Sequence, residues 1–440
     1  MSNCIPRWSY DQWNHKNHSL QIVMLFDRTL NFISGNHSLP CSVKIYRNLS
    51  EAVVIGLESI FIDNRYADKV IEKTLKQNPK WGARDRRFIA ETTYDIVRWY
   101  RLFIYLADAH EHDFWKLLGA WCLYNRIDPP NYEEFGDLNK KDFFERYDKA
   151  NNNIVLRESI PDWLNELGKK ELGTKWDAEI HALNEQAKVV LRANTLKESR
   201  TELQKQLQEL ENIATEASLE FPDALILGER QNIFTRPQFR DGLFEVQDAG
   251  SQAIAPFLKV EPGQRVIDAC AGAGGKTLHL SALLQNKGRI IAMDTEDWKL
   301  DELKKRARRA GAGNIETRVI ESSKTIKRLE GSADRLLLDV PCSGLGVLRR
   351  NPDAKWKLSP EFIEEVKATQ QKIINDYSVM LKPGGLMVYS TCSLLPSENE
   401  KQVEKFLETR KDQFELQEQK TIMPSEGFDG FFMARLKKKG

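Results

Sequence analysis

Short apolar runs alternate with helical patterns from about Ala249 to the C-terminus, and this alternation constrains the fold more than any other feature. The predicted strands are Arg265–Asp268, Arg289–Asp294, Arg335–Asp339 and Gly385–Thr391. The helix between the first two is expected to end at Gly288, and a helix that begins at Ser359–Pro360 is expected to run to about Met380. The pattern predicts an α/β domain with a doubly wound, Rossmann-like parallel sheet that binds ligands at the carboxyl ends of its strands. The segment Gly430–Leu436 fits a final strand, antiparallel to the others.

Four regions with different patterns divide the 440 residues, a length that indicates roughly three folded domains. Residues 1–44 are rich in Asn, Ser and His without a sustained period, which predicts a disordered extension. Residues 45–153 show helical periodicity and predict an all-helical domain. Residues 154–240 mix helix and strand patterns and predict a small α+β module. Residues 241–440 hold the α/β domain.

The charge balance excludes a strong global attraction to nucleic acid, because 65 Lys and Arg residues nearly cancel 64 Asp and Glu residues. RNA binding would therefore rely on local basic patches. Two such patches are Lys304–Arg309 and the group Arg349, Arg350, Lys355 and Lys357. Each patch fits a solvated helix face as well as a nucleic acid contact.

Six cysteines lack the paired spacing of a zinc site and the density of a disulfide scaffold, so no metal is expected. The apolar run Ile22–Phe26 is far shorter than the about 20 residues that span a bilayer. No basic signal-peptide region precedes it. We expect a cytoplasmic protein that binds no membrane.

Two of the cysteines follow predicted strands. Cys342 lies in Pro341–Gly344 and Cys392 lies in Ser390–Ser393, so both thiols should reach the same edge of the sheet. A single free cysteine is more often a buried structural residue. Beyond a strand end and beside small residues, however, a thiol is exposed and its pKa can be lowered. Two thiols at one edge therefore indicate covalent chemistry.

A Gly-rich turn, Asp268–Thr277, follows another predicted strand and matches neither the Walker A pattern nor the dinucleotide pattern. Its small residues let backbone amides approach a ligand. Asp294, one strand later, stands where an acid binds ribose hydroxyls. The pair suits an adenosyl cofactor, and a tight turn with a solvated Asp is the alternative.

These motifs carry a family resemblance. The segments Asp268–Thr277, Asp339–Gly344 and Ser390–Ser393 together resemble the Nop/Sun family of RNA cytosine-C5 methyltransferases. The helical pattern around Ala83–Arg98 is similar to the NusB-like RNA-binding domain of the RsmB branch, which implies 16S ribosomal RNA as the substrate. The resemblance covers roughly residues 45 to 440 and extends to the small α+β module, as an RNA-binding element.

The resemblance also implies a mechanism and site residues. Cys392 would add to C6 of the cytosine, and Cys342 would assist release, as the base that takes the C5 proton. Asp339 would hold the cytosine and contact the cofactor, S-adenosyl-L-methionine, while Lys276 would orient this carboxylate or the methionine moiety unless it is simply solvated. The other implied cofactor-binding residues are Cys270, Ala271, Gly272, Ala273, Gly274, Gly275, Asp294 and Glu321.

Two positions depart from the family pattern. Ala273 replaces a usual Pro, and Glu321 stands where an Asp is usual. Alternative functions are a tRNA cytosine-C5 methyltransferase, a DNA cytosine methyltransferase, or a non-catalytic ribosome-assembly factor that binds RNA. The second thiol, Cys392, argues against the DNA enzyme, whose nucleophile normally sits in the Pro-Cys motif. We expect a monomer with RNA as its partner and a role in rRNA processing.

Overall fold

The computed structural model describes residues 45–440, and the predicted extension of residues 1–44 lies outside the described residues. The described chain forms two compact units. The first contains residues up to Lys170 together with Arg350–Lys357, and the second contains Glu171–Arg349 and Leu358–Gly440. The domain boundaries at residues 153 and 240 stay predictions. No helix of residues 45–440 is long and apolar enough to cross a membrane.

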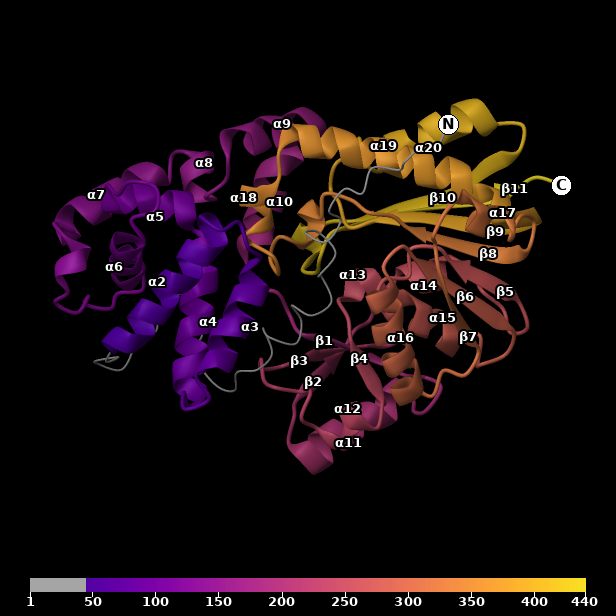
Figure 1. Ribbon diagram of the computed structural model, residues 1–440, viewed down its shortest axis with the longest axis horizontal. Helices are drawn as coiled ribbons and strands as arrows, with labels where there is room; N and C mark the ends of the chain where they lie inside the picture. The colour runs from indigo at the N-terminus through magenta and orange to yellow at the C-terminus, as the bar shows by residue number, and fades with distance from the viewer. Residues whose placement is uncertain (1–44) are drawn as a thin grey trace. The chain divides into compact units, whose positions relative to one another are not determined.

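The first unit is helical, as the periodicity predicts (Figure 1). Its main helices are α2 (Arg47–Phe61), α3 (Ala67–Gln77), α4 (Ala83–Arg98), α5 (Tyr100–Ala107), α6 (Phe114–Tyr124), α7 (Lys140–Ala150), α8 (Ile154–Arg157) and most of α9 (Asp162–Leu172). Val53, Leu57 and Ile60 of α2 are buried in one apolar core, as residues at this spacing on one helix face should be. The short helix α18 (Ala354–Lys357) belongs to the same unit.

The second unit begins with a small α+β module. A four-stranded antiparallel sheet has the order β2-β3-β1-β4 and is accompanied by helices. The elements are α10 (Trp176–Asn184), β1 (Val190–Ala193), α11 (Arg200–Glu211), β2 (Thr215–Ala217), β3 (Ala224–Leu227), α12 (Pro237–Arg240) and β4 (Phe244–Val246). The predicted small α+β module is confirmed.

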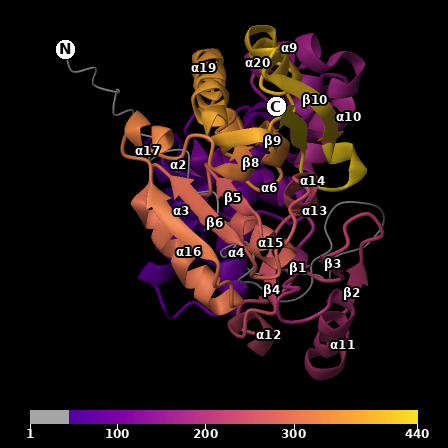
Figure 2. The ribbon, with the colours of Figure 1, turned by 90° about the vertical axis from the view of Figure 1, so that its right-hand side faces the viewer.

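The rest of the second unit is built on a seven-stranded sheet of order β10-β11-β9-β8-β5-β6-β7 (Figure 2). Its strands are β5 (Arg265–Asp268), β6 (Arg289–Asp294), β7 (Ile315–Val319), β8 (Ala333–Asp339), β9 (Leu381–Thr391), β10 (Phe414–Ile422) and β11 (Phe431–Lys438). The five strands from β9 to β7 are parallel; β11 runs antiparallel to β9, and β10, which pairs antiparallel with β11, has the same direction as the five. The predicted Rossmann-like sheet and its antiparallel last strand are confirmed.

Alternate residues of the parallel strands face opposite sides of the sheet, and each side carries its own helices. On one side Val266 and Leu337 pack with Leu280, from α15 (Gly275–Leu283). On the other side Ile267 and Leu338 pack with three further helices. Those helices are α17 (Ser323–Lys327), α19 (Pro360–Tyr377) and α20 (Glu400–Arg410). Because both faces are covered, only the strand ends can form a site.

One local prediction needs correction, and two strands were missed. The helix α15 ends at Leu283 rather than Gly288, because Gln285 and Asn286 adopt positive φ angles of 53° and 58° and turn the chain toward β6. The strands β7 and β10 were not predicted.

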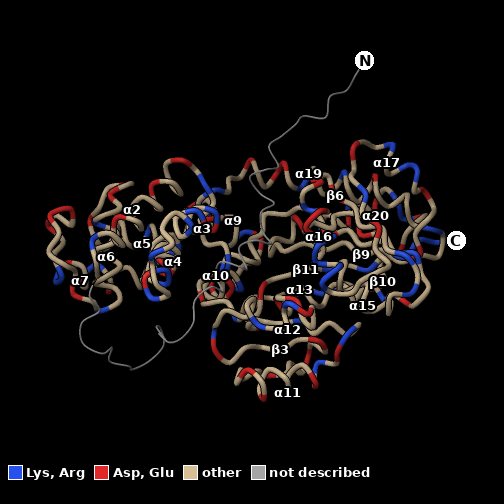
Figure 3. Tube along the Cα trace, turned by 60° about the horizontal axis from the view of Figure 1, so that its bottom comes forward, with Lys and Arg blue, Asp and Glu red and all other residues tan. Residues whose placement is uncertain are grey.

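Two arginines of the basic patch on α16 (Asp297–Ala310) are engaged inside the fold, whereas Lys304, Lys305 and Arg308 are exposed. Arg306 and Arg309 both bind the buried carboxylate of Glu245, at 2.9 and 2.5 Å. Lys304 pairs with Asp301 on the same helix at 2.8 Å. Along the described trace, Lys and Arg are interspersed with Asp and Glu (Figure 3). The structure therefore favours ion pairs over nucleic acid contact for the two arginines.

The second basic patch is also mainly structural. In the second unit, Arg349 is 4% exposed and donates to the backbone oxygen of Pro424 at 3.0 Å. In the helical unit, Lys355 is 1% exposed, and the Lys357 ammonium donates to the backbone oxygen of Ile60 at 3.1 Å. These side chains therefore bond within the fold, although burial lowers the pKa of Lys355 and of Lys357.

Candidate active site

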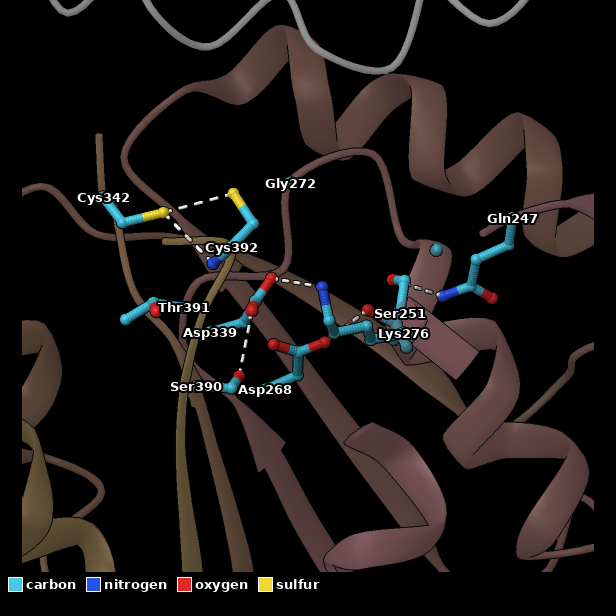
Figure 4. A network of polar contacts seen from close by, with 12 residues as sticks. Gln247, Ser251, Asp268, Gly272, Lys276, Asp339, Cys342, Ser390, Thr391 and Cys392 are labelled. Carbon is cyan, nitrogen blue, oxygen red and sulfur yellow. Dashed lines mark hydrogen bonds and ion pairs between the residues drawn. The ribbon is translucent and has the colours of Figure 1, made fainter. Parts of the chain in front are cut away.

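The two cysteine motifs meet at the carboxyl edge of the sheet. Cys342 follows β8 and Cys392 follows β9, the neighbouring parallel strand, and Asp339 is the register partner of Ser390. The two sulfur atoms are 3.2 Å apart, and the backbone N–H of Cys392 donates to the Cys342 sulfur at 3.2 Å (Figure 4). Cys342 is buried, whereas Cys392 is half-buried. The thiols thus form a contact pair, with Cys392 the more open member.

A carboxylate and an ammonium lie beside this pair (Figure 4). The Lys276 Nζ atom is 2.5 Å from Oδ2 of Asp339, and the Ser390 hydroxyl donates to Oδ1 at 2.9 Å. Burial opposes the charged form of Lys276, but the pairing with Asp339 outweighs it and raises the pKa of the ammonium. Lys276 is therefore cationic and held, rather than simply solvated.

The Gly-rich turn runs from the end of β5 into α15. Gly274 has a φ angle of 88°, and a Cβ atom there would lie 2.6 Å from the Leu303 side chain, so only glycine fits. Gly272 also has a positive φ, 53°, but a Cβ atom there would meet no heavy atom within 4 Å. The Cα side of Gly272 that carries no Cβ therefore faces open space, although its backbone N–H is bonded to Asp294.

Two side chains at the start of the turn, Asp268 and Cys270, have raised pKa values. Burial raises the pKa of Asp268 to about 7, despite the hydrogen bond from the Thr277 hydroxyl at 2.7 Å. The other oxygen of Asp268, Oδ1, is buried without a hydrogen-bond partner, which suits a ligand amine or ammonium. Burial also raises the pKa of the Cys270 thiol. Cys270 is therefore an unsuitable nucleophile at this edge.

Asp294 ends β6 and faces the turn. Its Oδ2 accepts from the backbone N–H of Gly272, and its Oδ1 accepts from that of Glu296, both at 3.0 Å. Lys299 lies 3.6 Å from the same carboxylate. Glu321 follows the end of β7, the next strand, and its side chain is exposed. Both acids are at the ligand edge, but only Asp294 is fixed by hydrogen bonds to the backbone.

Two arginines from other elements donate hydrogen bonds to backbone oxygens of the Gly-rich turn. Neither of them was assigned to the site from the sequence. Arg192 of β1 donates to the backbone oxygen of Gly275 at 2.6 Å and to the Gln247 side chain. Arg306 donates to the backbone oxygen of Ala273 at 2.8 Å. The only signal for Arg192 was its place in the small α+β module, to which the family resemblance extends. The small α+β module thereby helps to shape the turn.

The edge can therefore combine three chemical tasks. A half-buried thiol can add to an electrophilic carbon, a second thiol in contact with it can exchange a proton at the neighbouring atom, and a fixed carboxylate can bind a donor group. The turn and Asp294 can hold an adenosyl ligand next to them.

Two family descriptions match the chain. The 16S rRNA methyltransferase RsmB/F family matches residues 255–437, and the ferredoxin-like domain of RsmF/B-like methyltransferases matches residues 160–234. The second match covers the small α+β module through β3.

Relatives and solved structures extend this similarity. A Synechocystis protein named probable ribosomal RNA small subunit methyltransferase B is 34% identical over 429 residues, covering 85% of this chain and 95% of the relative. The crystal structure of PH0851 is 25% identical with a TM-score of 0.74, covering 90% of this chain and 100% of that one. A methyltransferase homologue from Pyrococcus horikoshii is 27% identical with a TM-score of 0.58, covering 65% of this chain and 98% of that one.

Proposed function

Because the chain belongs to the RsmB/F family of 16S rRNA methyltransferases, we propose that it methylates C5 of a cytosine in 16S ribosomal RNA through a covalent adduct. The cofactor of this family is S-adenosyl-L-methionine, which when bound supplies an electrophilic methyl group. One observation carries the covalent mechanism: two thiols in contact, 3.2 Å apart, at the edge that also holds the Gly-rich turn.

Cysteine addition solves the central chemical difficulty, which is that C5 of cytosine is a weak carbon nucleophile. The Cys392 thiolate forms a bond to C6, and the displaced electron pair makes C5 enamine-like, so that C5 can take the methyl group. Cys342 then accepts the proton from C5. The electrons of that C–H bond restore the double bond between C5 and C6 as the Cys392 sulfur leaves.

The charged pair beside the thiols orients the base in this proposal. Asp339 accepts from the exocyclic amine of the cytosine and shares a proton with N3. Lys276 and Ser390 each occupy one carboxylate oxygen and so fix its orientation. Such a pocket receives only a base that has left its stack, at a cost of about a few kcal/mol, which favours loops or partly opened RNA.

The cofactor would lie along the turn. Asp294 would accept from the ribose hydroxyls, and the partnerless oxygen of Asp268 would accept from the amino group of the methionine moiety. Backbone amides of the segment Cys270–Lys276 would approach the ligand, with Glu321 on the adenine side. The helical unit and the small α+β module would supply RNA contacts.

Separate replacement of the two thiols tests the mechanism. Cys392→Ala should form no adduct, whereas Cys342→Ala should attack and methylate and then remain attached to the RNA. Labelled 16S RNA with S-adenosyl-L-methionine, analysed on a denaturing gel, should show a slow, protein-sized band for Cys342→Ala alone. The double variant is the control and should trap nothing.

Other outcomes would contradict specific parts of the proposal. A trapped band with Cys392→Ala instead would reverse the two roles, and full activity in both variants would exclude the covalent route. Bisulfite sequencing of RNA from cells with and without the protein identifies the substrate. A cytosine that loses its methyl group in tRNA rather than in 16S RNA would overturn the proposed substrate.

A further inference from the structure

A buried glutamate connects the two cysteine motifs. Glu398 lies between β9 and α20 and is 0% exposed. Its Oε1 accepts from the Ser343 hydroxyl and from the Ser393 hydroxyl, both at 2.5 Å. Its Oε2 accepts from the backbone N–H of Ser343 at 2.7 Å and from the Gln370 side chain at 3.0 Å. Ser343 directly follows Cys342, and Ser393 directly follows Cys392.

The two serines make equivalent contacts in their own loops. The Ser343 hydroxyl oxygen accepts from the backbone N–H of Leu345 at 3.4 Å, and that of Ser393 accepts from the N–H of Leu395 at 3.2 Å. Each hydroxyl therefore closes the turn after its cysteine and donates its proton to the same carboxylate oxygen. The two hydroxyl oxygens are also 3.0 Å apart, and Glu398 joins these loops, which are fifty residues apart in sequence, by accepting from both.

Other bonds fix the glutamate itself. The hydroxyl of Tyr389, on β9, donates to the backbone oxygen of Glu398 at 2.7 Å. The neighbouring Asn399 donates to the backbone oxygen of Ser393 at 3.0 Å. Gln370, from α19, also donates to the backbone oxygen of Pro341 at 2.9 Å, so it holds the first cysteine loop as well. The carboxylate is consequently anchored to the sheet and to a helix.

Four donors converge on one buried carboxyl group, and this number points to an acceptor-only, ionised carboxylate. Burial raises the pKa of Glu398, and the bonds from Ser343, Ser393 and Gln370 oppose that rise. A buried carboxylate destabilises the fold unless all its hydrogen bonds are made. Removal of the Glu398 carboxylate would in turn leave the donors of both loops unpaired.

We propose that Glu398 is a positioning residue that holds Cys342 and Cys392 in contact, through Ser343 and Ser393. This inference rests on the proposed function, in which one sulfur bonds to C6 while the other serves the adjacent C5. Because these carbons are bonded neighbours, the two sulfurs must approach almost the same point. Loosening the loop of Cys392 would therefore impair the addition to C6, and loosening the loop of Cys342 would impair the removal of the C5 proton.

The first test measures thiol geometry without any methylation. Phenylarsine oxide bridges two sulfurs without joining them, so it binds most tightly to a pair already held in contact. Its dissociation constant should rise about tenfold or more in Glu398→Ala. Cys392→Ala gives the background from the other cysteines.

A matched control exists in the same unit. Glu179 is also buried and accepts from the backbone N–H and the hydroxyl of Ser425, at 2.9 and 2.7 Å, away from the cysteines. Glu179→Ala should bind the arsenical as the wild type does. Equal binding by Glu398→Ala and Glu179→Ala would overturn the inference.

The second test separates the two loops by their reaction steps. Ser393→Ala should slow adduct formation about tenfold or more and trap nothing. Ser343→Ala should instead accumulate the protein–RNA adduct, as Cys342→Ala does. Both variants should retain the wild-type cofactor affinity. A purely structural role would lower the folded yield of both variants and would not slow adduct formation in one variant while trapping RNA in the other.

The two hypotheses fail in distinguishable ways. If the wild type does not methylate RNA and Cys342→Ala traps none, while Glu398→Ala loses arsenical binding, the proposed chemistry fails and the positioning role stands. If the wild type methylates RNA while both serine variants match it in rate and trapped fraction, the positioning role fails and the proposed function stands.

Discussion

Replacement of Asp294 offers a direct measurement of cofactor binding. Its carboxylate is 8% exposed and accepts one backbone N–H at each oxygen, from Gly272 and Glu296, both at 3.0 Å. Each carboxylate oxygen has about two acceptor sites, so one site per oxygen remains for a ribose hydroxyl. Two charge-assisted bonds, each worth about 1.5 to 3 kcal/mol, are therefore available, together with the positioning of Gly272.

We expect Asp294→Ala to lose about 1.5 to 3 kcal/mol of binding free energy after local relaxation, which is about ten- to a hundredfold in the dissociation constant. Isothermal titration with S-adenosyl-L-methionine measures this. Asp334→Ala is a suitable control, because Asp334 also accepts a backbone N–H, from Arg265 at 2.8 Å, at the opposite end of the sheet. An unchanged dissociation constant for folded Asp294→Ala would refute the assignment of the ribose site.

Two further predictions concern the helical unit. Burial raises the pKa of Asp68 to about 6, so the folded state keeps a proton that the unfolded chain releases near pH 4. The contribution of Asp68 to stability is therefore complete below about pH 4 and is lost as the pH rises through about 6. In urea unfolding, the free energy of unfolding of Asp68→Asn relative to that of the wild type should rise by about 2 kcal/mol between about pH 4 and about pH 8. A difference that does not change with pH would contradict this. Trp356 donates to the backbone oxygen of Val97 at 2.7 Å and packs edge-on against Tyr100, so Trp356→Ala should destabilise the helical unit by about 3 kcal/mol without changing cofactor affinity. Melting curves and titration together check this, and an unchanged melting midpoint would show that residues 350–357 add no stability there.

The parallel sheet was predictable because its central strands are short, apolar and buried on both faces. β5 and β6 have the predicted bounds, Arg265–Asp268 and Arg289–Asp294. The two unpredicted strands lie at the edges of the sheet. β7 has every residue half-buried, and most of β10 is exposed, so neither carries the apolar run that marks a central strand.

The roles of the basic residues were not predictable, because they depend on partners distant in sequence. From its sequence neighbours, Arg306 is predicted to belong to an exposed basic helix face. In the structure it binds Glu245 and the backbone of Ala273. Arg192 lies inside a strand and reaches Gly275, 83 residues later. Charge patterning describes one helix at a time, and it cannot show a carboxylate that another element brings to that helix.

Sheet register alone does not explain why the two sulfurs touch. Asp339 and Ser390 are register partners, and neighbouring strands lie about 4.8 Å apart. Cys342 stands three residues beyond its partner position whereas Cys392 stands two beyond, so the sulfurs would not be level if both chains continued straight. The chain after β8 must therefore turn back toward the chain after β9, and the bonds from Ser343 and Ser393 to Glu398 cross that gap. The strands determine where both thiols emerge, and the buried carboxylate determines that they meet.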